Sequence, residues 1–417
     1  MNIWKNSKIK EIKAREILDS RGNPTVEVEL LTNLGNFLAS APSGASVGKY
    51  EAKELRDGGE RYKGKGALKA IKNIEEIIAP KLIGVEINNQ KEIDEILISL
   101  DGTKDKSNLG ANAILPVSMA VCRAGAAVQN LSLHRYIEKS IGETYGNYGK
   151  MPRPCFNIIN GGAHAGNDLD FQEFMIMPQL ETFSLNLQAG SEIYHTLKEI
   201  LKRDFGKTAI NVGDEGGFAP NLSTTEQALD LIMKAVERAG YENNAKIALD
   251  VAASEFYENK KYGVKTRDEM IDYYLELITK YPIISIEDPF NEDDFKGFSI
   301  LMDRCGDKIN IIGDDLLVTN IERIKQAQEK RACNGLLLKI NQIGVITEAI
   351  EAAKIAKLYN WKIMVSHRSG ETNDDFIADL AVGINAEYIK AGPPARGERV
   401  AKYNRLLKIE EEIHPIK

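Results

Sequence analysis

The segment Lys246-Ile247-Ala248-Leu249-Asp250 ends a short apolar run on a single carboxylate, and this arrangement decides the fold. It recurs along the second half of the chain at intervals of 37, 27, 25, 28 and 23 residues, about one strand plus one helix each time. The six end residues are Asp250, Glu287, Asp314, Lys339, His367 and Lys390. The pattern predicts an α/β fold with a (β/α)₈ barrel, in which side chains at the carboxyl ends of the strands point into one mouth.

The side chains gathered at that mouth predict a metal-dependent site for an anionic substrate. The carboxylates of Asp250, Glu287 and Asp314 would repel one another in a low-dielectric cavity unless a cation neutralised them. Ligands that are all oxygen favour Mg²⁺ or Mn²⁺ over zinc. Lys339 suits either an anion anchor or a base with a lowered pKa, and Lys390 suits a carboxylate or phosphate. Two alternative interpretations remain. The six residues could be ordinary charged loop residues, or a carboxylate could pair with a lysine or arginine instead of a metal ion.

The densest polar stretch, residues 366–372, predicts phosphate binding. Arg368 offers a planar fork for a phosphate, and Ser369 adds a hydroxyl and a backbone N–H. His367 is either a further phosphate contact or a structural histidine.

Two glycine-rich loops carry candidate acids. His164 lies in the first loop, residues 160–167, with Glu173 just beyond it, and Glu215 lies in the second, residues 213–217. Glycines let the backbone approach a ligand closely, and two neighbouring acids can raise one pKa enough to make a general acid. The alternative interpretation of each acid is that it is an ordinary solvated loop residue.

The N-terminal part of the chain predicts a smaller α+β domain over residues 1–138. Residues 8–41 have strand patterns, with Val26, Val28 and Leu30 alternating onto one face, and a Gly/Ser-rich loop follows at 42–48. The predicted helices are 66–80, 90–99 and 110–138. Residues 139–153 are polar and rich in glycine and proline, so the barrel domain is expected over residues 139–417.

Bulk properties exclude several classes of partner. The 417 residues are 43% hydrophobic and 28% charged, with a net charge of −7 and no basic stretch that would favour nucleic acid. We expect no membrane span, because no apolar run reaches about 18 residues, and no signal peptide. The four cysteines lack metal-binding spacing and are expected to be buried, reduced thiols, so a cytoplasmic protein is predicted.

The motifs resemble those of the enolase family along nearly the whole chain. They are DSRGNPTV at 19–26, PSGAS at 42–46, NIINGG at 157–162, GDEGG at 213–217, SIEDP at 285–289, GDD at 313–315, LKINQIG at 338–344 and SHRSGET at 366–372. Each motif is a modest signal alone, whereas all of them in order are specific. The resemblance implies a phosphopyruvate hydratase, a glycolytic and gluconeogenic lyase that interconverts 2-phosphoglycerate and phosphoenolpyruvate plus water. It also implies an enolase-type barrel that begins ββαα.

The resemblance implies a role for each candidate residue. Asp250, Glu287 and Asp314 would ligate a first Mg²⁺ at the substrate carboxylate, and Ser43 a second Mg²⁺ at the phosphate. Lys339 would remove the C2 proton, and Glu215 would protonate the C3 hydroxyl with help from Glu173. The remaining substrate-binding residues would be His164, His367, Arg368, Ser369 and Lys390. Cations on the carboxylate would stabilise the charge that develops there and lower the pKa of Lys339.

Two other readings remain at this stage. A different enolate-forming barrel, such as a racemase or cycloisomerase, would share the three carboxylates but lack the 366–372 stretch and the Ser43 loop. A non-catalytic paralogue could act as a binding scaffold, and an additional binding role would leave no trace in the sequence. The resemblance further implies a homodimer or a higher oligomer, and it leaves room for a cell-surface or secreted pool without a signal peptide.

Overall fold

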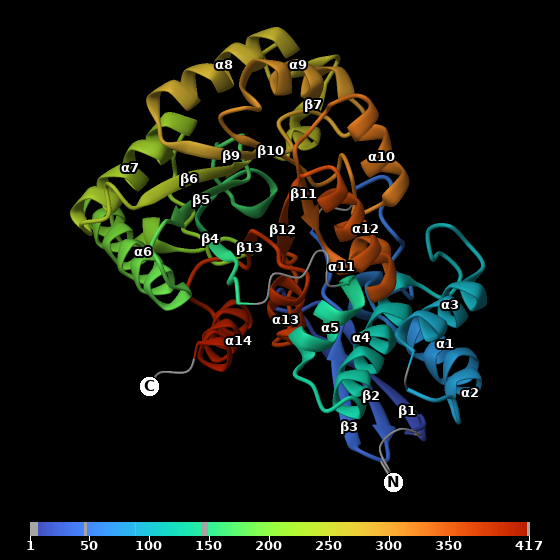
Figure 1. Ribbon diagram of the computed structural model, residues 1–417. Coiled ribbons are helices and arrows are strands. Elements are labelled where there is room, and N and C mark those ends of the chain that lie inside the picture. The colour runs from blue at the N-terminus through green and yellow to red at the C-terminus, as the bar shows by residue number, and fades with distance from the viewer. Residues whose placement is uncertain (1–6, 46–47, 88, 143–148, 415–417) are drawn as a thin grey trace. The chain divides into compact units, whose positions relative to one another are not determined.

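The computed structural model describes residues 7–45, 48–87, 89–142 and 149–414 (Figure 1). The expectations for the first six residues, for Ser46 and Val47 of the Gly/Ser-rich loop and for residues 143–148 of the polar boundary lie outside the described residues. The chain forms two compact units. The first comprises Met1–Lys150, Lys339–Lys354 and Arg368–Asn385, and the second comprises Met151–Leu338, Ile355–His367 and Ala386–Lys417.

A three-stranded antiparallel sheet begins the first unit, in the order β1-β2-β3. The strands are β1 (Glu11–Leu18), β2 (Pro24–Thr32) and β3 (Gly35–Ser40). Val26, Val28 and Leu30 of the central strand are fully buried, as the alternating pattern predicts. The helix α4 (Ala111–Val128) packs against β2 and β3, so the apolar face of the sheet meets the apolar helix.

The helices of this unit follow the predicted ranges with one difference. The segment 66–80 forms α1 (Leu68–Asn73), a π-helical turn (Ile74–Ile78) and α2 (Ala79–Leu82), and 90–99 lies in α3 (Gln90–Asp101). The single helix expected at 110–138 is wrong, because α4 ends at Val128 and α5 (Leu133–Ile141) begins after a turn. Asn130 in that turn has a φ of 54°, a left-handed conformation that asparagine tolerates and that an α-helix cannot continue through.

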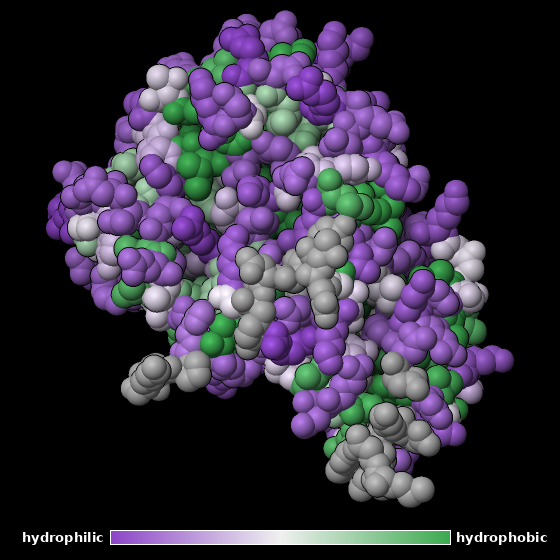
Figure 2. Space-filling model, viewed as in Figure 1, coloured by the Kyte–Doolittle hydropathy of each residue, from purple (hydrophilic) through white to green (hydrophobic). Residues whose placement is uncertain are grey.

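Helix α4 also corrects the expectation that no segment has the length and apolar character of a membrane span. It meets both criteria, but 83% of it is buried inside the protein. That burial is typical of a core helix, and α4 is weak support for a membrane location. The face in Figure 2 is mainly hydrophilic, with small separate hydrophobic areas.

The second unit contains a closed eight-stranded barrel in the order β10-β11-β12-β13-β4-β5-β6-β9, as predicted. Strand β5 is antiparallel to both of its neighbours, whereas the other pairs are parallel. The strands are β4 (Arg153–Asn160), β5 (Glu173–Pro178), β6 (Ala245–Asp250), β9 (Ile283–Glu287), β10 (Asn310–Gly313), β11 (Gly335–Leu338), β12 (Lys362–Ser366) and β13 (Tyr388–Lys390).

Helices lie outside these strands (Figure 1). After β4 and β5 come α6 (Phe183–Phe205) and α7 (Thr225–Arg238), which gives the ββαα start. The other helices of this unit are α8 (Arg267–Lys280), α9 (Phe295–Cys305), α10 (Ile321–Glu329) and α14 (Gly397–Ile413), and a short hairpin forms from β7 (Tyr257–Glu258) and β8 (Lys261–Tyr262). The first unit includes α11 (Ile340–Ile343), most of α12 (Ile346–Leu358) and α13 (Phe376–Gly383).

The barrel interior is a packed apolar core with charged residues at the ends of its strands. The core cluster is Cys155, Met175, Met177, Ala248, Ile312, Leu337 and Met364. Asp250, Glu287 and Lys390 are the last residues of their strands. Asp314, Lys339 and His367 each come directly after a strand, so the expected position of all six end residues is confirmed. The four cysteines are buried and free, also as expected.

Candidate active site

Three acids lie side by side on neighbouring barrel strands. Glu173 is the register partner of Asp250, and Asp250 is in turn the partner of Glu287. Glu173 opens β5, whereas the other two residues close β6 and β9. Because β5 runs antiparallel, its first residue lies at the same end of the barrel as the last residues of its neighbours. All three side chains are almost completely buried.

The Lys390 ammonium group sits among these acids. Its Nζ lies 2.8 and 2.9 Å from the two carboxylate oxygens of Glu287, 3.2 Å from Asp250 Oδ2 and 3.3 Å from Glu173 Oε2. Burial alone would lower the pKa of Lys390, but the three carboxylates raise it well above its ordinary value. The alternative in which strand-end acids pair with a lysine is therefore realised for Asp250 and Glu287.

Asp288 adds a further buried carboxylate beside Asp314. It accepts hydrogen bonds from the backbone N–H groups of Asp314 (2.9 Å) and Asp315 (2.6 Å), which fixes the turn after β10. Asp288 has a φ of 41°, so its backbone is held in a conformation that few non-glycine residues adopt. The sequence analysis missed this residue, although its position directly after Glu287 is a signal of its own. Burial and the charge of Asp314 raise the pKa of Asp288 well above its usual range.

This donor set fits a divalent cation. Oxygen atoms of Asp288, Asp314 and Asp315 lie within 4.8 Å of one another, and this group shares only Asp314 with the predicted set Asp250, Glu287 and Asp314. Burial, followed by repulsion from Asp250, raises the pKa of Glu287 well above its ordinary value even though Lys390 contacts it. The Lys390 ammonium group therefore does not offset the burial and mutual repulsion that disfavour the ionised carboxylates, and a bound cation would stabilise their ionised form. Their ligand atoms are all oxygen, the chemistry that Mg²⁺ favours.

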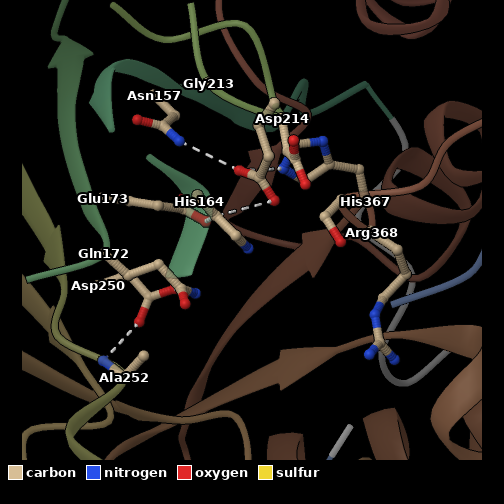
Figure 3. A network of polar contacts seen from close by, with 12 residues as sticks. Asn157, His164, Gln172, Glu173, Gly213, Asp214, Asp250, Ala252, His367 and Arg368 are labelled. Atoms are coloured by element: carbon tan, nitrogen blue, oxygen red, sulfur yellow. Dashed lines mark hydrogen bonds and ion pairs between the residues drawn. The ribbon is translucent and has the colours of Figure 1, made fainter. Parts of the chain in front are cut away.

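A second cluster surrounds Glu215, which lies in the glycine-rich turn between α6 and α7. Asn157 Nδ2 donates to Glu215 Oε2 at 3.1 Å, and His367 Nε2 lies 3.4 Å from the same oxygen. His164 Nδ1 is 3.6 Å from Glu215 Oε1 and 3.8 Å from Glu173 Oε1. In Figure 3, dashed lines run from the side chains of Asn157 and His164 to one carboxyl group, that of Glu215, and the side chain of Glu173 ends beside His164. Asn157 escaped the sequence analysis because an amide inside a buried strand gives no local signal.

The Glu173–Glu215 pair is an acid pair with unequal proton affinities. Burial, followed by the negative charge of Glu215, raises the pKa of Glu173 well above its usual range. Burial would also raise the pKa of Glu215, but His164 and His367 outweigh it and lower that pKa. Such a pair retains a proton at neutral pH because two adjacent buried carboxylates do not both ionise. Gln172, also missed, donates from Nε2 to Asp250 Oδ2 at 3.4 Å and borders the cluster.

The remaining predicted site residues belong to the first unit. Ser43 forms an antiparallel bridge with Gly370, and its hydroxyl donates to Glu54 Oε2 and accepts from Arg56, both at 2.9 Å. No sequence pattern singles out Glu54 or Arg56. The Ser43 hydroxyl is thus held inside a polar network.

Arg368, its neighbour Ser369 and Lys339 complete the predicted set in the first unit. The guanidinium of Arg368 contacts Glu51 through NH1 (2.7 Å) and NH2 (3.2 Å), and NH1 also donates to Asn341 Oδ1 at 3.1 Å. The backbone oxygen of Ser369 accepts from a serine hydroxyl in the segment after β1. Lys339 is half-buried directly before α11. Glu51 is a further residue that sequence reasoning missed.

Comparison with known proteins agrees with this arrangement over almost the whole chain. A family model described as the enolase C-terminal TIM barrel domain matches residues 149–416, and one described as the enolase N-terminal domain matches residues 9–137. An enolase of Methanocaldococcus jannaschii is 53% identical over 412 residues, which cover 97% of this chain and 95% of that protein. An enolase of Mastigamoeba balamuthi and enolase B of Dictyostelium discoideum are each 53% identical over 426 residues, covering 98% of this chain and 96% of either relative.

Proposed function

The chain belongs to the enolase family, and from this premise we propose that it interconverts 2-phosphoglycerate and phosphoenolpyruvate plus water. The observation that carries the proposal is the combination of two features in the second unit. One is a group of buried carboxylates suited to a cation, and the other is the unequal acid pair Glu173–Glu215. Removal of a proton next to a carboxylate needs the first feature, and loss of a poor leaving group needs the second.

Lys339 is proposed as the base at C2. Its neutral amine takes the C2 proton, and the electron pair of the C–H bond moves toward the substrate carboxylate. Mg²⁺, held by Asp250, Glu287 and Asp314, would supply electrostatic stabilisation of the negative charge on those carboxylate oxygens. Lys390 is proposed to offer its ammonium group to the same substrate carboxylate, because its strong proton affinity keeps it charged.

Glu215 is proposed as the acid at C3. It gives a proton to the C3 hydroxyl, the C3–O bond breaks with its electron pair on the departing water, and the C2–C3 double bond forms. Glu173 assists because its raised pKa keeps a proton next to Glu215 in the free enzyme. His164, within reach of both carboxylates, is proposed to orient the pair and to contact substrate.

Arg368, Ser369 and His367 are proposed to bind the substrate. The Arg368 fork has the geometry for two phosphate oxygens, and it is already oriented by Glu51. A second Mg²⁺ per active site is part of the proposal, with Ser43 as a ligand. For that role the Ser43 hydroxyl must exchange its contacts with Glu54 and Arg56 for the ion.

Three further proposals concern the whole protein. Residues 1–138 are assigned as a capping domain and 139–417 as the catalytic barrel domain. The chain is proposed to act in the cytoplasm, and to do so as a homodimer or higher oligomer. A role as a non-catalytic scaffold is the weaker hypothesis, since each candidate catalytic residue is present and the two acid clusters are formed.

The direct test is the formation of phosphoenolpyruvate by the purified full-length chain, followed by its ultraviolet absorbance. With 2-phosphoglycerate and Mg²⁺, absorbance should rise to an equilibrium value, and adding phosphoenolpyruvate instead should reach the same value from above. The Lys339→Ala variant serves as the matched inactive control. A folded wild-type protein that produces no phosphoenolpyruvate would refute the proposed activity.

A further inference from the structure

Arg399 is a completely buried arginine near the start of α14, and it contacts His367 directly. Its NH1 lies 2.7 Å from His367 Nδ1. A guanidinium group has only hydrogen-bond donors, so Nδ1 must be the acceptor in this contact. A neutral imidazole that accepts at Nδ1 carries its hydrogen at Nε2. The geometry therefore selects one tautomer of His367.

The selected hydrogen faces the acid pair. His367 Nε2 lies 3.4 Å from Glu215 Oε2 and, among the residues that the structure describes, makes no hydrogen bond. It is thus a buried N–H directed at a carboxylate oxygen at long range, a contact of the kind that shortens when a substrate completes a site. Asn157 donates to the same oxygen, which leaves Oε1 of Glu215 facing His164.

Close packing holds Arg399 in this position. Gly392 has a φ of 81°, and a Cβ atom at that position would lie 2.9 Å from Arg399 Cδ and 3.1 Å from the carbonyl oxygen of Glu215. Arg399 NH2 also donates to the carbonyl oxygen of Asp214 at 3.3 Å. The arginine thus bridges the turn that carries Glu215 and the loop that carries His367.

We propose that Arg399 is a positioning residue for the acid step, which holds His367 as the neutral tautomer with its Nε2 hydrogen directed at Glu215. The inference rests on the proposed function only in treating Glu215 as the acid. Asn157 and His367 both face Oε2, so Oε1 is the oxygen positioned to exchange the proton that the Glu173–Glu215 pair retains. Loss of Arg399 would let His367 adopt the other tautomer and remove the donor from Oε2.

The surrounding charges support this arrangement. Burial lowers the pKa of His367 to about 3, with Glu215 opposing and Arg399 and Lys390 adding to the decrease. Protonation of His367 is disfavoured because a second positive charge would adjoin Arg399. The ring therefore stays neutral throughout the neutral pH range, and its tautomer decides which ring nitrogen donates a hydrogen bond.

The tautomer can be measured in the intact protein by ¹⁵N-histidine NMR, with His367 assigned from the signals lost in His367→Gln. The chain has five histidines, so the spectrum is simple. Wild-type His367 should show the hydrogen at Nε2 across the neutral range, and Arg399→Met should show a mixture with the Nδ1 form. A wild-type ring with its hydrogen at Nδ1, or a charged ring, would overturn the proposal even if Arg399→Met does not fold.

Kinetics supply the second readout. Arg399→Met should lower kcat by roughly 10- to 100-fold, by analogy with the loss of a residue that orients a metal-binding histidine. In a plot of kcat against pH, the acid limb of this variant should move to higher pH, because His367 loses a neighbouring positive charge. Arg399→Lys retains a donor and should restore part of the rate. Unchanged kcat and pH profile in a folded Arg399→Met enzyme would also overturn the proposal.

Tyr403→Phe is the matched control. The Tyr403 hydroxyl donates to the carbonyl oxygen of Gly392 at 2.6 Å, so its loss loosens the same helix and loop without touching His367. It should change stability but leave the His367 tautomer and the pH profile as in wild type. An equal kinetic effect in both variants would reduce Arg399 to a structural residue. Full dehydration activity in Glu215→Gln would instead refute the assignment of Glu215 as the acid. The tautomer of His367 is measured independently of that assignment.

Discussion

Glu51 and Arg368 form a buried ion pair within the first unit, with two contacts of 2.7 and 3.2 Å between carboxylate and guanidinium. Both side chains are about 4% exposed, so water does little to solvate either charge. The arginine proposed to bind phosphate is therefore held, before substrate arrives, by an internal carboxylate. We therefore expect stability and phosphate binding to depend on each other.

Glu51→Gln should lower the free energy of unfolding by about 3 kcal/mol, because it leaves a buried guanidinium without its counter-charge. Inorganic phosphate should restore more stability to this variant than to the wild type. Urea unfolding with and without phosphate measures both effects. The exposed pair of Lys325 with Glu322 supplies the control, since Glu322→Gln should cost less than about 1 kcal/mol. Equal phosphate stabilisation in Glu51→Gln and wild type would argue that phosphate does not bind Arg368.

Lys339→Ala should abolish exchange of the C2 hydrogen of 2-phosphoglycerate with solvent, since the variant lacks the proposed base. Glu215→Gln should retain exchange and lose dehydration, because the base persists while the leaving group receives no proton. Mass spectrometry in deuterated water follows exchange, and phosphoenolpyruvate absorbance follows dehydration. Exchange at the parent rate in Lys339→Ala would place the base elsewhere.

The strand-end residues were predictable because each belongs to a local pattern, an apolar run that stops at one charged residue. Glu173 opens its strand, and only the antiparallel direction of β5 brings it beside Asp250. Sequence alone suggested an acid on the same face but could not give that register. Arg399 was missed altogether, since it lies inside a helical pattern and reaches His367 only through packing around Gly392. Tertiary packing, rather than local pattern, decides such contacts.

Asp374→Asn should lower the free energy of unfolding at neutral pH. This difference from wild type should disappear at acidic pH. Arg123 contacts both carboxylate oxygens of Asp374 at 2.8 Å; burial would raise the pKa of Asp374, but Arg123 outweighs burial and lowers it. A carboxylate with a lowered folded-state pKa contributes stability above its unfolded pKa of about 4, and that contribution disappears as pH falls through the folded value. Urea unfolding of both proteins over an acid pH series measures the difference.

The control for this series is Asp303→Asn, because the contact of Asp303 with Arg331 is solvent-exposed on both sides. It should give a small difference that does not change with pH. A constant difference between Asp374→Asn and wild type from neutral to strongly acidic pH would contradict the role assigned to the Arg123 pair.

Removal of divalent cations should abolish turnover, because burial and repulsion from Asp250 disfavour the ionised form of Glu287 even beside Lys390, and a cation would stabilise that form. Treatment with a chelator followed by gel filtration prepares the metal-free enzyme. Adding Mg²⁺ should restore activity, and Asp314→Asn should need a higher Mg²⁺ concentration for half-activation. Full turnover in thoroughly chelated wild type would end the metal assignment.

Ser43→Ala should weaken the proposed second Mg²⁺ more than the first. Asp250 and Glu287, the proposed ligands of the first ion, lie at strand ends of the barrel, whereas Ser43 would contribute one neutral oxygen that is already bonded to Glu54 and Arg56. Loss of that oxygen should raise the Mg²⁺ concentration needed for turnover and leave metal binding to the free enzyme nearly unchanged. Calorimetric titration without substrate and a Mg²⁺ activation curve with substrate separate these two effects.

Ser40→Ala is the control, because the Ser40 hydroxyl bonds to Glu27 within the sheet and its loss should alter neither curve. If substrate-free Mg²⁺ affinity falls as steeply as activity in Ser43→Ala, then Ser43 belongs to the first site or to the fold, and the second site needs another ligand.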